Sequence, residues 1–463
     1  MMGVYSRKFL KMLICLTTAF GIAACSSGNK NNSNNASDKN SSEKKSIGKS
    51  TQSITATEFT TDYKIEYAKD GYFTASKLDG KLMGLLNFQG KTVIPFEYDY
   101  VSFPVSKNAK AVIVSKEGKE GILDYNGKEI LPIEYNDIHC DYVNGFRYGE
   151  KYGENKTRYL VTKDGIQSIV NLQGKTEKTL KGKYDALTAD ALLANMDAGP
   201  EGFLQVYTLD EKEITTPSHN FAKETGINGI VEFTGQYNTS SDEDTTISYL
   251  VDKNGNYQEI KCIDRDGGDL NYLGNENLLS VECSKGEIYS VDYYCRRLVN
   301  VKDKSVSKTK YIDIIGNESG AYGLYQDSSK NYIVDIYNTG GEITKKLTYD
   351  NDTVNDVRFA GPWIKVSAGD TKRLYNKEGK QPSDQRYLDV YPIKRTNLLL
   401  LENIDGKFGI MDSSGDMLAE FGKIDEGLKD DLENESCKVY EFENSACIVE
   451  KKSSGSHVTL YTK

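Results

Sequence analysis

Short apolar runs separated by turn residues make up most of this chain. Residues 111–115 form one apolar run, and after a turn residues 121–125 lead into Asn126-Gly127. An Asn-Gly pair between two such runs is a strong signal of a β-hairpin, and residues 128–134 then return. Tyr135 begins the next run. The pattern predicts a unit of four short antiparallel strands.

This unit is written out twice in succession, in residues 80–99 and 118–136, where the marker residues Gly84 and Gly121 are 37 positions apart. The pattern continues in weaker form through ten copies with a mean period of about 42 residues, which predicts a repeat architecture. The ten marker residues are Gly84, Gly121, Ser168, Gln205, Tyr249, Ser290, Tyr332, Arg373, Gly409 and Val458.

A second marker, Tyr-x-Asp followed by Ile or Val, supports the same register. It begins at Tyr135, Tyr311 and Tyr387, and variants with a shifted Asp begin at Tyr98 and Tyr184. We expect the aromatic and branched residues to pack between neighbouring modules, and the Asp residues to cap turn backbone. The alternative is that the Asp residues form a ring of ligands.

The fold class that follows is all-β, built from tandem four-stranded repeats. A β-propeller-like ring protects its strand edges by repetition, whereas an open β-solenoid needs capped ends. We favour the propeller. Because ten modules are many for one ring, two smaller propellers or an open array remain alternatives.

The best-preserved copies resemble the WG-repeat family, also called KWG repeats. The likeness is carried by Gly80-Lys81-Leu82-Met83-Gly84, Gly118-Lys119-Glu120-Gly121 and residues 406–412, together with the module ends at Tyr98 and Tyr135. The tryptophan of the family is missing in every copy, and Met83, Glu120 and Phe408 stand in its place. The family is a bacterial repeat, often exported and without a common activity, so the resemblance implies an architecture and little about function.

The N-terminus has the layout of an export signal. Residues 1–24 carry three basic residues and then an apolar run that is too short to span a bilayer. They end in Ile-Ala-Ala before Cys25, which looks like the lipobox of bacterial lipoproteins, whose cysteine sulfur is lipidated. We expect a signal peptide in residues 1–24, a lipidated Cys25 with a disordered polar tether through residue 56, and the repeat domain in residues 57–463. An ordinary cleaved signal is the alternative.

Charge narrows the class of partner. The formal net charge is −10, and removal of residues 1–24 leaves 55 basic against 68 acidic residues, or −13. Such a balance argues against nucleic acid as a partner. The expected partners are the membrane, through the lipid on Cys25 at the extracytoplasmic face of the cell membrane, and an envelope protein or glycan.

Six cysteines lie beyond Cys25. An even number in an exported protein permits disulfides, and the local pairs Cys283/Cys295 and Cys437/Cys447 flank hairpin-like segments. Buried free thiols are the alternative. The six cysteines are Cys140, Cys262, Cys283, Cys295, Cys437 and Cys447.

Candidate chemistry is sparse. The three histidines stand in unrelated contexts, and no nucleophile elbow, zinc motif or phosphate-binding loop occurs, so we expect no catalytic residue, metal or cofactor. Asp264, Asp266 and Asp269 are the weak candidates for a Ca²⁺ site, with a turn as the alternative. Trp363 is the weak candidate for a sugar-stacking platform, with a core position as the alternative.

These observations favour a non-catalytic cell-surface lipoprotein whose repeat body binds an envelope protein, peptide or glycan. Two alternatives stay open. One is a divergent hydrolase that uses carboxylates held by a propeller, and the other is a structural spacer.

Overall fold

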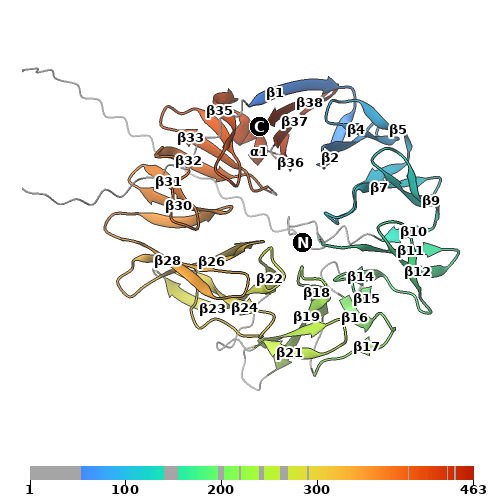
Figure 1. Cartoon of the computed structure of the whole chain (residues 1–463), viewed down its shortest axis with the longest axis horizontal. Coiled ribbons are helices and arrows are strands. Elements are labelled where there is room, and N and C mark those ends of the chain that lie inside the picture. Colours follow the sequence, from blue (N-terminus) through green and yellow to red (C-terminus); the bar gives the residue numbers. More distant parts are fainter. Residues whose placement is uncertain are drawn as a thin grey trace, which may run out of the picture. The chain divides into compact units, whose positions relative to one another are not determined.

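The computed structural model describes residues 54–139, 155–196, 203–217, 221–238, 244–260, 270–288, 291–394, 396–434, 436–442 and 445–463. These residues belong to one compact unit, residues 46–463. Almost all regular structure in them is antiparallel β-sheet, and we divide it into ten modules in chain order (Figure 1).

Modules 1 to 5 each contain four strands. Module 1 consists of β2 (Lys64–Lys69), β3 (Tyr72–Ser76), β4 (Met83–Asn87) and β5 (Thr92–Tyr98). Module 2 consists of β6 (Tyr100–Ser102), β7 (Ala111–Lys116), β8 (Lys119–Asp124) and β9 (Glu129–Tyr135). Module 3 consists of β10 (Asp137–His139), β11 (Arg158–Lys163), β12 (Ile166–Asn171) and β13 (Thr176–Thr179). Module 4 consists of β14 (Ala186–Thr188), β15 (Leu192–Met196), β16 (Phe203–Thr208) and β17 (Glu213–Ile214). Module 5 consists of β18 (Phe221–Glu224), β19 (Ile230–Asn238), β20 (Asp244–Asp252) and β21 (Tyr257–Ile260), and its β18 pairs with β16 of module 4 at one residue pair, Phe203 and Ala222.

Modules 6 to 10 vary more in strand number. Module 6 consists of β22 (Leu270–Tyr272), β23 (Leu278–Ile288) and β24 (Val291–Asn300). Module 7 consists of β25 (Asp313–Asn317), β26 (Gly320–Gln326), β27 (Tyr332–Tyr337) and β28 (Ile343–Tyr349). Module 8 consists of β29 (Asp356–Ala360), β30 (Trp363–Ala368) and β31 (Thr371–Tyr375), and module 9 of β32 (Tyr387–Pro392), β33 (Leu399–Asn403), β34 (Phe408–Met411) and β35 (Met417–Ile424). Module 10 consists of β36 (Cys437–Phe442), β37 (Ser445–Lys452) and β38 (Gly455–Thr462), preceded by the helix α1 (Leu428–Glu433).

The fourth strand of module 10 comes from the other end of the sequence. β1 (Thr55–Thr61) pairs antiparallel with β38 over its full length, from Thr55 opposite Thr462 to Thr61 opposite Ser456. Residues 55 and 56, which sequence analysis assigned to the tether, therefore belong to this strand. The pairing joins the first strand to the last one and closes the array.

Buried apolar clusters lie at every joint between consecutive modules. Ten such clusters connect module 1 to 2, 2 to 3 and so on through 9 to 10, and the last connects module 10 back to module 1. Phe73 of β3 and Cys447 of β37, for example, share the cluster that joins modules 1 and 10. This continuous circle of packing confirms the β-propeller-like prediction and rules out the open solenoid and the two smaller propellers for the described residues.

The predicted register is confirmed. Nine marker residues lie in the third strand of their module, from Gly84 in β4 to Val458 in β38, and the remaining one, Ser290, is outside the described residues. A Cβ at Gly84 would come within 2.7 Å of the carbonyl oxygen of Ile94, and one at Gly121 within 2.9 Å of that of Leu131. Glycine at this position lets the fourth strand bulge close to the third.

The position before the marker makes the contact with the next module. Met83 packs into the apolar joint, whereas Glu120 and Gln167 bond to backbone in or just before the first strand of the next module. The carboxylate of Glu120 accepts from the N–H of Ile138 at 2.7 Å. Gln167 both accepts from the N–H of Tyr184 at 2.7 Å and donates to its carbonyl at 2.8 Å.

The tyrosines of the second marker have the predicted role, but the Asp of the three Tyr-x-Asp copies does not cap a turn. The tyrosines pack between modules, with Tyr311 fully buried and Tyr387 3% exposed. The residue directly after Tyr98 or Tyr135 does cap the following β-turn, since Asp99 accepts from the N–H of Glu117 at 2.8 Å and Asn136 from that of Asp164 at 2.9 Å. The Asp of the Tyr-x-Asp copies instead contacts a side chain, Asp137 that of His139, Asp313 that of Arg296 and Asp389 that of Lys372.

Ring closure depends on Gly455, where β38 passes the end of β1. Its φ is +137°, and a Cβ there would lie 1.9 Å from the carbonyl oxygen of Thr61. We expect Gly455→Ala to destabilise the protein by about 3 kcal/mol or more, because backbone strain adds to a clash with backbone. The measurement is the urea midpoint. Gly80→Ala is the control, since φ is +70° there and nothing lies near the added Cβ, so its cost should stay near 1 kcal/mol. Equal shifts in the two variants would contradict this prediction.

Candidate functional site

Several of the candidate residues singled out from the sequence lie outside the described part of the chain. This applies to Cys25 and to the three weak metal candidates Asp264, Asp266 and Asp269, as well as to Cys140, Cys262 and His219. Among the residues that the structure describes, no group of three or more His, Cys, Asp or Glu side chains is arranged to hold a metal ion.

Trp363 is not available as a stacking platform, which corrects that prediction. Its side chain is 3% exposed and packs at the joint of modules 8 and 9, beside Leu374 and Leu399. The apolar neighbours of β30 bury the ring, so the core alternative holds.

The possible disulfide between Cys437 and Cys447 is also excluded. Cys437 lies opposite Glu450 and Cys447 opposite Tyr440, so the two thiols project from opposite faces of the sheet, into different apolar clusters. Both are free and buried, and burial raises the pKa of the Cys437 thiol to about 12. Cys283 and Cys295 do lie directly opposite each other on β23 and β24, so a disulfide between them remains a prediction.

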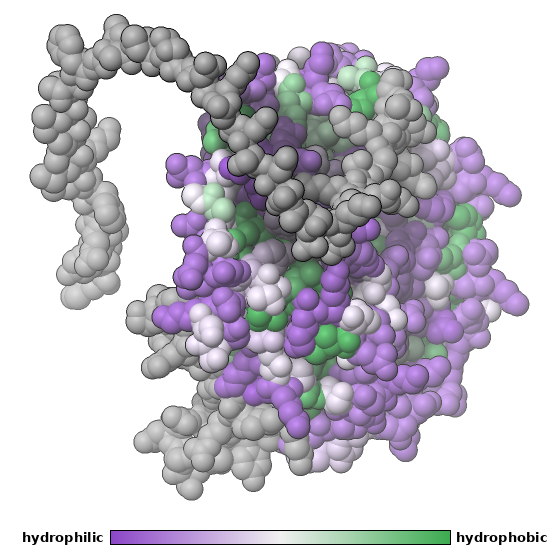
Figure 2. Space-filling view, turned by 60° about the vertical axis from the view of Figure 1, so that its left-hand side comes forward, coloured by the Kyte–Doolittle hydropathy of each residue, from purple (hydrophilic) through white to green (hydrophobic). Residues whose placement is uncertain are grey.

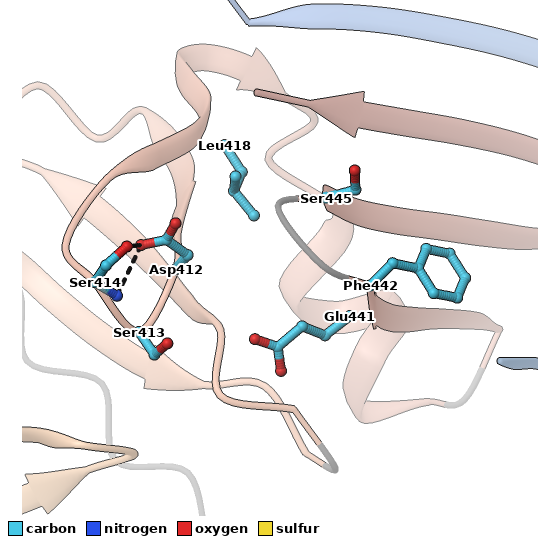
Figure 3. A pocket seen from close by; sticks show the side chains of 7 residues that line it. All are labelled: Asp412, Ser413, Ser414, Leu418, Glu441, Phe442 and Ser445. Carbon is cyan, nitrogen blue, oxygen red and sulfur yellow. Dashed lines mark hydrogen bonds between the residues drawn. The ribbon is translucent and has the colours of Figure 1, made fainter. Parts of the chain in front are cut away.

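A pocket of about 370 Å³ lies where modules 9 and 10 meet. Residues Asp412, Ser413 and Ser414 come from the turn between β34 and β35, and Glu441 and Ser445 flank the turn between β36 and β37. The remaining lining residues are Leu418 and Phe442. Figure 3 shows these side chains around the opening.

Asp412 forms one wall of the pocket and is held in place by its own turn. Its Oδ1 accepts from the N–H of Ser414 at 2.9 Å, from the Ser414 hydroxyl at 2.7 Å and from the N–H of Asp416 at 2.9 Å. The Lys463 ammonium bonds to Asp416 and lies 3.8 Å from Asp412 Oδ2. The three donors to Oδ1 hold the Asp412 carboxylate in one orientation, with Oδ1 turned toward its own turn.

Glu441 forms the opposite wall. Its Oε2 accepts from the backbone N–H of Asn397 at 2.7 Å and from the Asn397 side-chain amide at 3.2 Å. Asn397 belongs to the loop between β32 and β33, so a third loop fixes this carboxylate. Alternation along β36 explains the direction, because Val439 and Glu441 face module 9 while Tyr440 and Phe442 face module 1.

Sequence reasoning did not find this pocket. The turn from Asp412 to Gly415 was identified only as a copy of the repeat, and neither Asn397 nor Glu441 carries a motif. The sequence does show serine and carboxylate side chains both after β34 and near the end of β36. They indicate a common site only once modules 9 and 10 are known to be adjacent.

The exposed apolar surface elsewhere is scattered. Figure 2 shows a largely hydrophilic face on which hydrophobic residues form small separate patches. The large exposed apolar side chains, such as Leu78, Ile166 and Ile404, belong to different modules. Single residues of this kind are normal on a folded protein and do not mark a docking site.

The two histidines that the structure describes, His139 and His457, contact different groups in different modules. His139 Nε2 lies 2.5 Å from a carboxylate oxygen of Asp137, and this hydrogen bond raises the pKa of His139 above its ordinary value of 6.5. His457 Nδ1 lies 3.3 Å from the hydroxyl of Thr60 on β1.

Within the described ranges, the only helix is six residues long, and none is long and apolar enough to cross a membrane.

Comparisons with known proteins give structural similarity only. No protein-family model matches the sequence, and no curated protein matches it. The chain is similar to the crystal structure of a eukaryotic initiation factor, with 10% identity over 77% of this chain and 96% of the other and a TM-score of 0.37. It is also similar to BamB from Moraxella catarrhalis, with 10% identity over 88% of this chain and 98% of the other and a TM-score of 0.28. A third similar structure is apo AztD from Citrobacter koseri, with 10% identity over 62% of this chain and 86% of the other and a TM-score of 0.28.

Proposed function

We propose that this chain is an extracytoplasmic lipoprotein, held at the cell membrane through Cys25, whose repeat body is a non-catalytic recognition module of the WG-repeat type. Its partner is an envelope protein or glycan that contacts the loops around the pocket of modules 9 and 10. The observation that carries the proposal is that pocket, which is lined by polar side chains from consecutive loops on a closed scaffold.

The scaffold supports this proposal because its strands pair and pack with one another, which leaves the loops as the surface for a partner. Apolar clusters fill the joints between all ten modules, and β1 completes the last sheet. Binding sites are commonly made of loops that a rigid framework positions, and here the pocket-lining loops leave β34 and β36 at the same edge. The turn between β33 and β34 connects to the other end of β34, so it lies at the opposite edge of the sheet.

Anchoring is tested with Cys25→Ser. We expect the wild-type protein to fractionate with membranes and to incorporate a clickable palmitate analogue, because a thioether-linked lipid requires the cysteine sulfur. Cys25→Ser should lose both properties, whereas Cys437→Ser, which changes a buried thiol of β36, should keep them. A variant without Cys25 that still carries the label would contradict lipidation at this residue.

Recognition is tested by site-specific photo-cross-linking in intact cells. A photoreactive residue at the exposed position Ser413 should cross-link to a defined envelope component, whereas the same residue at Asp405, exposed in the turn at the opposite edge, should not. Identical products from the two positions, or none from Ser413, would contradict a partner at the pocket edge.

A further inference from the structure

The pocket between modules 9 and 10 has an excess of negative charge. Asp412, Asp416 and Glu441 supply three carboxylates at or next to it, and the Lys463 ammonium, bound to Asp416, supplies one positive charge. Among the described side chains named here, the local balance is therefore −2, three negative charges against one positive. A site with this balance favours a cationic group over an anionic one.

Glu441 is the carboxylate that a ligand would meet. Within the described residues it forms no ion pair, since its Oε2 is bonded to the two Asn397 donors and no basic side chain lies within ion-pair distance. Figure 3 shows its carboxylate directed across the pocket toward Ser413 and Asp412. A protonated amine in the pocket would supply the missing positive partner.

The rest of the lining adds hydroxyl groups on an apolar floor. Ser413 offers a hydroxyl that can donate and accept. The hydroxyls of Ser414 and Ser445 donate to Asp412 and Thr462 and can still accept, and the buried Leu418 adds apolar surface. A volume of about 370 Å³ is at the lower end of the range for small-molecule sites. These groups suit the hydroxyls of a sugar-sized molecule.

We propose that this pocket binds a small hydroxylated molecule that carries a protonated primary amine, the chemistry of an amino sugar with an unacylated nitrogen. Glu441 receives the ammonium group and the three serines contact the hydroxyls. This inference rests on the proposed recognition function and names its ligand class.

The structure supplies an internal probe for such binding. Trp363 is the single tryptophan of the chain. A Cβ at Gly415 would lie 3.0 Å from the Trp363 ring, so the turn that carries Asp412 and Ser414 packs directly on the indole. A ligand that shifts this turn changes the surroundings of the only indole.

The experiment titrates the soluble body, residues 54–463, with D-glucosamine at low ionic strength, followed by calorimetry and by Trp363 fluorescence. We expect saturable one-to-one binding that weakens as salt is added. N-acetyl-D-glucosamine, which has similar hydroxyls but no charge, should bind at least about tenfold more weakly, because it cannot form the charge-assisted bond. Absence of glucosamine binding at millimolar concentration, or equal binding of the two sugars, would overturn the proposal.

Matched variants locate the site. Glu441→Gln keeps an acceptor for Asn397 but removes the charge, and should weaken glucosamine binding about tenfold. Ser413→Leu, a change at an exposed position, should block the pocket with little effect on folding. Glu426→Gln is the control. Glu426 is exposed between β35 and α1, and it follows the end of β35 that is farther from the pocket.

The outcomes separate this inference from the proposed function. Loss of glucosamine binding in Glu441→Gln but not in Glu426→Gln supports the site, and equal binding in both variants overturns it. A protein that is anchored through Cys25 and cross-links from Ser413 but fails to bind glucosamine would keep the proposed function and remove only this ligand class.

Discussion

Lys156→Met is expected to destabilise the protein by about 3–5 kcal/mol, because it leaves a buried carboxylate without its cation. The Lys156 ammonium donates to Glu224 Oε1 and to the carbonyl of Leu187, both at 2.9 Å, and only 5% of its side chain is exposed. Glu224 also accepts from the Thr188 hydroxyl and the Ala189 N–H, each at 2.7 Å. The pair ties β18 of module 5 to the segment just before β11 of module 3 and to module 4. The measurement is the urea midpoint and slope.

Two further variants serve as controls for this prediction. Lys107→Met removes a pair with Glu318 whose side chains are 48% and 85% exposed, and should cost less than about 1 kcal/mol. Adding Glu224→Gln to Lys156→Met removes the unpaired charge but keeps an acceptor for Thr188, so the double variant should be more stable than Lys156→Met alone. A Lys156→Met protein as stable as Lys107→Met would contradict the prediction.

The same pair has a pH dependence of known sign. Burial opposes ionisation of Glu224, but the Lys156 charge and the donors around the carboxylate outweigh it and hold the pKa below its ordinary value of 4.5. A lowered folded pKa gives stability that is present above pH 4.5 and is lost as the pH falls through the folded value. Wild type should therefore lose more stability than Glu224→Gln when the pH is lowered below 4.5.

Removal of β1 is expected to have a comparable or larger effect. A chain that begins at Tyr63 lacks all seven residues of β1, and each ladder hydrogen bond contributes roughly 0.5–1.5 kcal/mol, so we expect a loss of about 5 kcal/mol. The loss also exposes β38 as a long unpaired edge and removes Phe59, whose ring lies 6.0 Å from that of Phe73. Thermal unfolding and light scattering of residues 63–463 would show a lower Tm and association of chains.

The control for this truncation is a chain that begins at Ile54, which retains β1 and should match the full-length body. Addition of a synthetic peptide of residues 54–62 should restore part of the stability of the shorter chain, because the edge of β38 is a ready template for this strand. If residues 63–463 were as stable as residues 54–463, β1 would not be needed to close the ring.

The repeat could be predicted from the sequence because its signals are local. Gly84 and Gly121 are required by the close approach of the fourth strand, and the Asn126-Gly127 turn and the tyrosines recur with the module. The strand that closes the ring could not be predicted in this way. The tenth copy, which ends at Val458, is the poorest match, and the structure gives the reason: the strand that follows β38 in the sheet is β1, about 400 residues earlier in the sequence.

The candidate site could not be predicted because its residues are unremarkable one at a time. Glu441 is one of many glutamates on a strand, and its direction depends on the face that β36 turns toward module 9. Asp412 comes to lie opposite Glu441, which Asn397 holds, only because three loops are adjacent in the folded chain. Trp363, the most conspicuous residue for carbohydrate binding, is buried because it fills a joint between modules.

The position of β1 has a mechanical consequence. Its seven residues form the link between the covalent chain before Ile54 and the last sheet, and their ladder bonds to β38 lie perpendicular to the strand. A pull on the N-terminal side directed along β1 therefore loads these bonds together in shear, not one after another as in peeling. If the N-terminus is tethered and a partner holds the loops, tension reaches the ring at this seam first. The force that the closed ring withstands is then set by one short strand.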